Sequence, residues 1–417
     1  HKAIRRQRQM CIRDSSSRAN PIGMMDYEHG QNETKTYGLH ANAYLVLQPI
    51  KNLKFRSSFG VRYLQNNYRK FAPVYNLSSD NFRNENEVQQ QMTTRMNWMI
   101  ENTINYTFSA GRNNFDILLG QSVENNGLGM SMNGSNKNSL FNDFEHAYLD
   151  NTKVILAAST TLGGAPITPH KMASFFGRVN YDYNEKYMLT FVMRADGSSN
   201  FKRGKRWGYF PSLSAAWRLD QEAFMENIVS KGLNNLKLRV SYGSLGNNSI
   251  GNYDAISLYG KTVYVFNNKP AIGMAQSAIS NASVTWESTY VTDIGLDFGL
   301  FNNRLSGTID WFNKRTVDIL INLPTPAVHG STSIPKQNSA TVTNKGIELS
   351  LGWQDQVSDF SYYINGNFTY VKNEVNKYKG TGVDGREING AKVLWEGYPI
   401  NAGYMLLVDR IIQTDED

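Results

Sequence analysis

A basic, glycine-punctuated stretch contains the residue types that most directly suggest chemistry. It reads RADGSSNFKRGKRWGYFPSLSAAW over residues 194–217, and its central cations are Lys202, Arg203, Lys205 and Arg206. Cations clustered this closely can bind phosphate or nucleic acid, but a solvated loop between two strands often has the same composition. The elements around the stretch therefore decide between a binding site and a turn.

Other motifs that would carry catalysis or bind a cofactor are weak. Gly380, Gly382 and Gly385 have GxGxxG spacing, but their flanks are polar and loop-like, which argues against a dinucleotide site. The six histidines lack metal-ligand spacing, and a single cysteine excludes a zinc ribbon or a disulfide framework. His40 is the only histidine in a predicted strand, and it has no hydrolase partners beside it. We expect no enzyme, no metal and no cofactor.

The distribution of charge argues against a nucleic-acid partner. The net charge is +7, but residues 1–20 alone hold six Lys or Arg against one Asp. This segment also contains the only cysteine, Cys11, and it lacks the apolar region of a signal peptide. We interpret residues 1–20 as a non-native or disordered basic segment, and residues 21–417 as the folded part. The folded part is nearly neutral, so bulk charge gives no reason to expect nucleic acid.

Alternation of apolar and polar residues is the dominant pattern of the sequence. Segments with this period of two lie near residues 37–47, 53–63, 94–108, 115–124, 173–183, 187–195, 210–219, 236–244, 289–300, 305–314, 345–353 and 360–370. From residue 53 onward the apolar positions carry no charge, and charged residues occupy the opposite parity. The pattern predicts about twelve or thirteen strands, each with an apolar face and a wet face.

The connections between these strands alternate in length. Short connections are predicted at 48–52, 109–114, 184–186, 301–304 and 354–359, and long ones at about 64–91, 125–171, 245–285 and 315–343. Two connections, 196–209 and 220–235, fit the alternation less well. Short turns at one end and long loops at the other are typical of an antiparallel outer-membrane β-barrel. No apolar run is long enough for a transmembrane helix.

Aromatic residues on the apolar parity gather beside the short turns. They are Tyr106, Phe108, Tyr181, Tyr183, Tyr187, Trp217, Trp353 and Tyr362. Such a girdle is expected at a membrane interface, although a soluble β-sheet core also contains aromatic residues. In this arrangement residues 187–194 and 209–217 form a hairpin. The four cations then belong to its outward loop, and we do not expect them to bind nucleic acid.

The same hairpin resembles a motif of the SusC/RagA family of TonB-dependent outer-membrane transporters. The matching positions are Arg194, Asp196, Gly197, Ser198, Ser199, Phe201, Trp207, Phe210, Pro211 and Trp217. Further stretches similar to the family cover 236–253, 286–320, 338–351 and 396–417. Family barrels have about 22 strands and a plugged lumen. The resemblance therefore implies that residues 21–417 are an incomplete barrel, the central part of a longer transporter.

The resemblance also implies a function, a location and partners. The whole protein would import oligosaccharides, or less often peptides, across the outer membrane of a Gram-negative-type cell. A SusD-like surface lipoprotein would serve as a lid, TonB would supply the energy, and lipid would surround the barrel. Two alternatives stay open: a passive porin-type barrel, and a secreted β-sandwich binding module.

Charged residues on the wet face are candidates for lining the transport path. They are Arg56, Arg62, Glu101, Arg178 and Arg194. Since every strand has a wet face, these side chains are also consistent with ordinary solvated positions.

Overall fold

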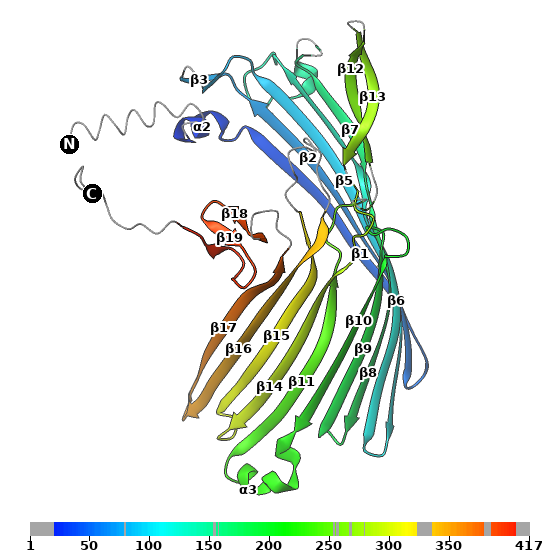
Figure 1. The fold of residues 1–417 in the computed structure, drawn as a ribbon, viewed down its shortest axis with the longest axis vertical. Coiled ribbons are helices and arrows are strands. Elements are labelled where there is room, and N and C mark those ends of the chain that lie inside the picture. The colour runs from blue at the N-terminus through cyan, green and yellow to red at the C-terminus, as the bar shows by residue number, and fades with distance from the viewer. Residues whose placement is uncertain are drawn as a thin grey trace, which may run out of the picture. The chain divides into compact units, whose positions relative to one another are not determined.

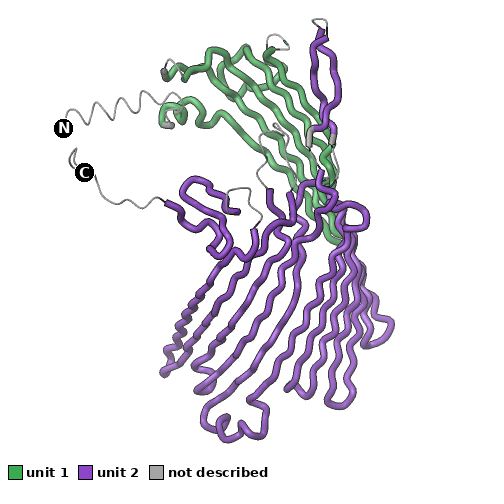
Figure 2. Tube along the Cα trace, viewed as in Figure 1, with its two compact units in different colours: residues 1–43, 59–99, 125–169 green, residues 44–58, 100–124, 170–417 purple. Residues whose placement is uncertain are grey.

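The computed structural model describes residues 21–78, 81–152, 156, 158–252, 255, 258–266, 269–278, 280–322, 336–378 and 385–405. Segment 1–20 and two glycines of the GxGxxG spacing, Gly380 and Gly382, lie outside the described residues. The chain divides into two compact units (Figure 2). Unit 1 comprises residues 1–43, 59–99 and 125–169, and unit 2 comprises residues 44–58, 100–124 and 170–417.

Long strands dominate the described part of the chain. In hydrogen-bonded order they are β1 (Asn32–Ile50), β2 (Leu53–Ala72), β5 (Glu87–Ala110), β6 (Asn113–Lys137), β8 (His170–Tyr183), β9 (Tyr187–Ser198), β10 (Trp207–Arg218), β11 (Leu233–Asn247), β14 (Glu287–Leu300), β15 (Leu305–Ile321), β16 (Gln337–Val357) and β17 (Phe360–Tyr378) (Figure 1). With β7 (Thr161–Ile167) paired to β6, they form a 13-stranded sheet whose order ends at β1 and β17. Every predicted strand is present, and the prediction of an incomplete all-β barrel is confirmed.

The remaining elements are short. They are α2 (Pro21–Glu28), β3 (Tyr75–Ser78), β4 (Asn81–Arg83), η1 (Leu149–Asn151), η2 (Leu219–Gln221), η3 (Ala223–Met225), α3 (Glu226–Val229), β12 (Leu258–Phe266), β13 (Lys269–Ala278), β18 (Glu387–Asn389), β19 (Lys392–Leu394) and β20 (Ala402–Gly403). Among the helices that the structure describes, none has the length and hydropathy to cross a membrane.

The five short turns occur at the predicted places. Between β8 and β9, Asn184 and Glu185 have φ values of 55° and 56°. Left-handed residues are favoured in tight hairpins because their twist matches that of the flanking strands. The connection predicted at 220–235, which is long for this end of the strands, contains η2, η3 and α3 and ends where β11 begins at Leu233.

The long connections are shorter than the alternation predicts. Strand β5 begins at Glu87 instead of near residue 94, β6 continues to Lys137, and the 245–285 connection contains the hairpin of β12 and β13. Residues 89–91 of β5 are all glutamine, and the apolar residues of β6 change from odd positions at 115–123 to even positions at 128–132. The alternation is therefore interrupted while backbone pairing continues. The prediction failed there because periodicity reports burial rather than hydrogen bonding.

The apolar parity of the strands is exposed along unit 2. Leu189 on β9, Ile294 on β14 and Ile309 on β15 have exposed fractions of 42%, 43% and 46%. A β-sandwich would bury such rows beneath a second sheet, so the sandwich alternative does not account for this unit. Uncovered apolar rows backed by a polar face are what a lipid-facing wall requires.

Aromatic rings at the short-turn ends contact one another across neighbouring strands between β5 and β10. Ring centroids of Phe108 and Phe115 are 4.7 Å apart, and those of Phe115 and Tyr181 are 5.0 Å apart. Tyr187 stacks on Trp217 at 6.3 Å. Offset and tilted aromatic contacts stabilise pairs beyond their buried area. The rings therefore reinforce the short-turn end of unit 2.

Candidate functional site

The wet face of β8 and β9 holds two of the predicted lumenal arginines. Arg178 is the Cα partner of Val192, so it lies diagonally opposite Arg194 on the same face. The Nη2 of Arg178 lies 3.3 Å from Asp116 Oδ1, and Asn105 Nδ2 donates to the same oxygen at 3.2 Å. The positive charge of Arg178 is therefore matched by a carboxylate on the neighbouring strand.

Arg194 is also paired. Its Nε lies 2.8 Å from both carboxylate oxygens of Asp196, and its Nη2 donates to Ser174 Oγ at 3.1 Å. The guanidinium carbon lies 5.5 Å from the centroid of the Phe176 ring. Because Asp196 is itself buried, this pair fixes the backbone just below the hairpin tip.

The other predicted residues lie elsewhere. The Arg56 guanidinium lies 4.9 Å from the centroid of the Tyr44 ring, and Ser58 Oγ contacts the backbone oxygen of Glu101 at 3.4 Å. Arg62 is exposed on the part of β2 that belongs to unit 1. The five candidates therefore do not converge on one site, and β6 separates the β2–β5 pair from β8 and β9.

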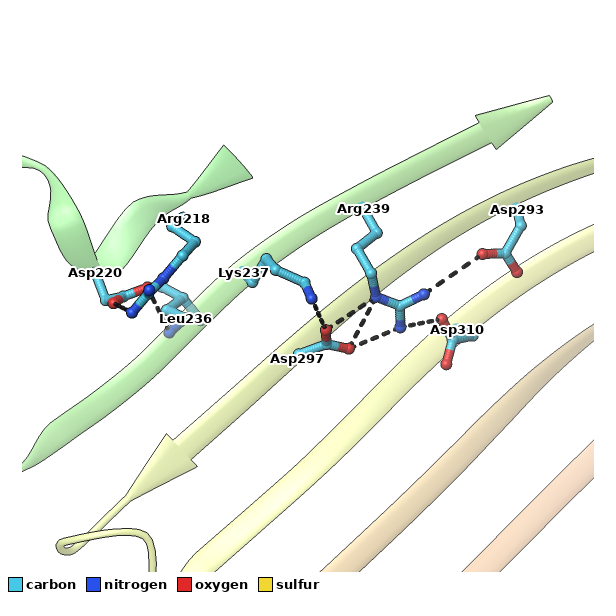
Figure 3. A network of polar contacts seen from close by, with 8 residues as sticks. All are labelled: Arg218, Asp220, Leu236, Lys237, Arg239, Asp293, Asp297 and Asp310. Atoms are coloured by element: carbon cyan, nitrogen blue, oxygen red, sulfur yellow. Dashed lines mark hydrogen bonds and ion pairs between the residues drawn. The ribbon is translucent and has the colours of Figure 1, made fainter. Parts of the chain in front are cut away.

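A charge network on the wet face centres on Arg239, which is not among the predicted lumenal residues. Arg239 on β11 binds Asp297 on β14 through Nε at 2.9 Å and Nη2 at 2.7 Å (Figure 3). Its Nη2 also lies 2.8 Å from Asp310 Oδ1 on β15, and its Nη1 lies 3.9 Å from Asp293 Oδ1. Lys237 adds a contact of 3.2 Å to Asp297. The network therefore adds side-chain contacts to the backbone pairing of three neighbouring strands, β11, β14 and β15.

Gly295 makes this network possible. It is the Cα partner of both Arg239 and Asp310, so Arg239 reaches across β14 to the strand beyond. A Cβ atom at this position would lie 2.1 Å from Asp310 Oδ1 and 2.6 Å from Arg239 Nη2. Only glycine leaves room for the side chains that meet above it. A wet-face glycine flanked by charges of opposite sign on adjacent strands was the signal available in the sequence.

We expect Gly295→Val in the complete protein to separate Arg239 from Asp310 and to leave the contact with Asp297 in place. The unfolding free energy should fall by about 1–2 kcal/mol, since a partly buried carboxylate loses its charged partner. Heat-dependent gel mobility across a temperature series measures the change. Thr308→Val is the matched control, because Thr308 lies on the same wet face as the Cα partner of Asp297 and already carries a branched Cβ. Equal losses for both variants would contradict the role given to Gly295.

The hairpin of β9 and β10, which carries the four clustered cations, is closed by a small apolar core. Phe201 is 1% exposed, and its ring centroid lies 5.3 Å from that of Trp286. Trp286 Nε1 donates to the backbone oxygen of Arg206 at 2.9 Å, while Lys205 Nζ donates to Ser283 O at 2.9 Å. The prediction of a hairpin is confirmed. Two of its four cations bind backbone oxygens, because Arg206 Nε also donates to Phe201 O within the loop, while Lys205 binds the connection before β14.

A second histidine lies in a strand, which corrects the prediction that His40 is the only one. β8 begins at His170, because its ladder starts before the apolar alternation does. His170 Nε2 lies 3.1 Å from Ser198 Oγ, and Asn248 Nδ2 contacts that oxygen at 3.0 Å. Ser198 is 1% exposed and its hydroxyl also accepts the backbone N–H of Asn200. A serine enclosed in this way cannot reach a substrate, so the group is structural.

At the short-turn end of the strands, the carboxylate of Glu222 links the start of β9 to the end of β10. Glu222 accepts hydrogen bonds from Tyr187 Oη at 2.7 Å and Trp217 Nε1 at 2.9 Å, and Lys186 Nζ lies 2.5 Å from its other oxygen. The Lys186 ammonium, followed by the Tyr187 hydroxyl, lowers the pKa of Glu222 from its ordinary 4.5 to about 2. The charged carboxylate therefore orients two girdle rings and one turn.

The lowered pKa predicts a pH dependence for this turn. A depressed carboxylate stabilises the fold fully above its unfolded pKa and loses that contribution as pH falls from about 4.5 towards 2. We expect thermal stability of the complete protein to decline over this window, and Glu222→Gln to flatten that part of the profile. Heat-modifiability midpoints measured from pH 6 to pH 2 test this. An unchanged acid profile in the variant would contradict the assignment.

Comparison with known proteins agrees with this architecture. The family model described as "TonB dependent receptor-like, beta-barrel" matches residues 8–404. A curated relative, TonB-dependent receptor P3 of Formosa agariphila, is 31% identical over 362 residues, which cover 86% of this chain and 35% of the relative. TonB-dependent receptor SusC of Bacteroides thetaiotaomicron is 26% identical over 374 residues, covering 88% of this chain and 35% of that protein. The chain thus spans about a third of these relatives.

Solved structures give the same result. A structure of the RagAB peptide transporter matches with a TM-score of 0.79 and 25% identity, covering 90% of this chain and 40% of that one. The siderophore receptor PiuA from Acinetobacter baumannii matches with a TM-score of 0.52 and 12% identity, which supports the fold alone.

Proposed function

The chain belongs to the TonB-dependent receptor-like β-barrel family, and from that premise we propose that the complete protein is an energised outer-membrane importer of neutral oligosaccharides. Its relatives include SusC and its structural neighbours include RagAB, so it is of the SusC/RagA type. The proposed partners are TonB, which supplies energy, and a SusD-like surface lipoprotein, which covers the entrance. The surrounding lipid contacts the apolar face of the strands.

The pairing of three wet-face arginines with carboxylates is the observation that carries the choice of substrate. Arg178, Arg194 and Arg239 each have a carboxylate partner within 3.3 Å. Beside the first two pairs, amides and hydroxyls bond to one another, as where Thr190 Oγ1 donates to Asn180 Oδ1 at 2.9 Å. A wall of balanced charges with many hydroxyl and amide groups suits a ligand that offers hydroxyls rather than net charge.

Peptide import is the second candidate. It is favoured by the RagAB structures, which are named as a peptide importer and peptide transporter. A passive porin-type barrel would share the strands, the girdle and the wet face. Energy dependence separates it from an importer, since diffusion through a porin needs no TonB.

The test uses the complete protein in two assays. Calorimetric titration with neutral oligosaccharides, and with oligopeptides of the same length, should show binding of the oligosaccharides. Whole-cell uptake of the bound class should stop when TonB is deleted. If only peptides bound, the substrate would be a peptide and not an oligosaccharide. If uptake continued after TonB was deleted, the protein would be a passive porin and not an importer.

A further inference from the structure

Unit 1 contains an open cavity of about 850 Å³ that the transport function does not use. Its lining comes from β1, β2, β5, β6 and β7, and from the connection after β6. The lining residues on which the argument depends are Glu33, Lys35, Arg69, Met92, Met132 and Leu162. Cavities of this size hold small molecules or headgroups.

The cavity opens on the apolar-parity face rather than on the wet face. Glu33 and Lys35 share their parity on β1 with Tyr37 and Leu39, which are 56% and 61% exposed. Four residues of strand rise about 13 Å, so Leu39 lies about that far along β1 from Lys35. The cavity therefore lies on the parity that we propose faces lipid, near the end of β1 that is opposite to its short turn.

An ordered connection forms one wall of the cavity. The Arg69 guanidinium lies 4.3 Å and 4.5 Å from the ring centroids of Phe144 and Tyr148, and its Nη1 donates to Glu145 O at 3.0 Å. Leu149 N donates to Gln90 Oε1 at 2.9 Å. These contacts hold residues 144–149 against the outer face, so the wall is built before any ligand arrives.

A second anchor fixes the start of the same connection. Asn86 is 6% exposed, accepts the backbone N–H of Ser139 at 2.7 Å and donates to Asn142 Oδ1 at 2.7 Å. A buried amide satisfied in this way specifies a single loop conformation. The cavity is therefore a formed site and not a gap beside a loop without contacts.

The cavity has a polar rim with a cationic excess. Lys35 and Arg69 carry two positive charges against the one carboxylate of Glu33, which lies 3.4 Å from Lys35 Nζ and 3.8 Å from Arg69 Nη2. The Lys35 side chain is 59% exposed, so its ammonium is accessible to a ligand. The amide of Asn67 and the phenol of Tyr148 also line the cavity and can bond hydroxyls.

The opposite rim is apolar and uncovered. Met92, Met132 and Leu162 have exposed fractions of 40%, 48% and 79%. Methionine packs well against irregular or flexible apolar groups such as acyl chains. A ligand that satisfies both rims must carry an anionic, hydroxyl-rich part and a hydrocarbon part.

We propose that this cavity binds an anionic glycolipid of the outer leaflet, with a phosphorylated saccharide on the Lys35 side and acyl chains against Met92, Met132 and Leu162. The assignment depends on the proposed outer-membrane location, because only there does this face meet such lipid. A transported saccharide would meet the wet face instead and would leave the apolar rim uncovered.

The test measures binding of lipopolysaccharide to the complete, delipidated protein in phosphatidylcholine nanodiscs. We expect Lys35→Glu combined with Leu162→Glu to weaken binding at least about tenfold. Lys70→Glu is the matched control, since Lys70 follows Arg69 on β2, has the opposite parity and does not line the cavity. Its affinity should stay within about twofold. Each single variant is also measured, so that misfolding of the double variant cannot hide the result.

Further probes show whether the bound molecule is a glycolipid, another anionic lipid or free phosphate. Deacylated phosphorylated saccharide and phosphatidylglycerol should each bind at least about tenfold more weakly than lipopolysaccharide, and inorganic phosphate at millimolar concentration should not compete. TonB-dependent uptake is measured in parallel, so loss of import and loss of lipid binding are separate outcomes. Wild-type affinity in the double variant and in both single variants, or equal binding of phosphatidylglycerol, would overturn the proposal.

Discussion

Leu296→Arg or Ile309→Arg should prevent assembly of the complete protein in the outer membrane. The two residues are Cα partners on β14 and β15, and Leu296 lies four residues from the end of β14. That distance is about 13 Å along the strand, near the middle of an apolar band about 25 Å tall. A cation there costs about 2–4 kcal/mol. Loss of heat-modifiable protein from the outer-membrane fraction measures the effect.

Thr308→Arg is the matched control for these variants. Thr308 is adjacent to Ile309 in sequence and is the Cα partner of Asp297, so it occupies the wet face beside a carboxylate. The same cation should be tolerated at this position, and assembly should stay close to that of the wild type. Similar assembly of all three variants would show that the faces are assigned wrongly.

Residues 21–417 expressed alone should aggregate or remain sensitive to protease in detergent. The sheet order ends at β1 and β17, and each edge presents unpaired N–H and C=O groups. A backbone group buried in hydrocarbon without a partner costs about 2–7 kcal/mol, and an edge strand has several of them. Their sum exceeds the usual net stability of a domain, about 5–15 kcal/mol. Size-exclusion chromatography and limited proteolysis measure the outcome.

The complete protein in the same detergent is the control for this experiment. It should resist protease, because further strands can pair with both edges. If residues 21–417 ran as a heat-resistant monomer on a gel, the open edges would be satisfied within this segment, and the prediction would be wrong.

The faces of the strands were predictable because alternation depends on local sequence alone. Leu296 and Asp297 are neighbours whose opposite environments follow directly from the period of two. The strand ends were less predictable, since residues such as Glu87 extend the ladder where a run of glutamines at 89–91 interrupts the alternation. His170 begins β8 for the same reason.

The pairing of side chains across strands could not be predicted from the same pattern. Arg239 meets Asp310 only because register places Gly295 between them, and alternation gives the face of a residue but not its partner. The cavity in unit 1 depends on residues 144–149 folding back onto Arg69, and this connection has no periodicity. The sequence showed Gly295 and charges of both signs on the wet face, but it did not show which charged side chains meet.

The central claim is that one face of these strands lies in lipid and the other lines an aqueous path. Nitroxide labels at Leu296→Cys and Asp297→Cys, each in a background of the complete protein that has no other cysteine, test it in native outer membranes. Collision rates with oxygen, which concentrates in lipid, and with a water-soluble nickel chelate report the surroundings of each label. We predict that oxygen collisions dominate at position 296 and nickel collisions at position 297. Equal accessibility to the two reagents at both positions would contradict the claim.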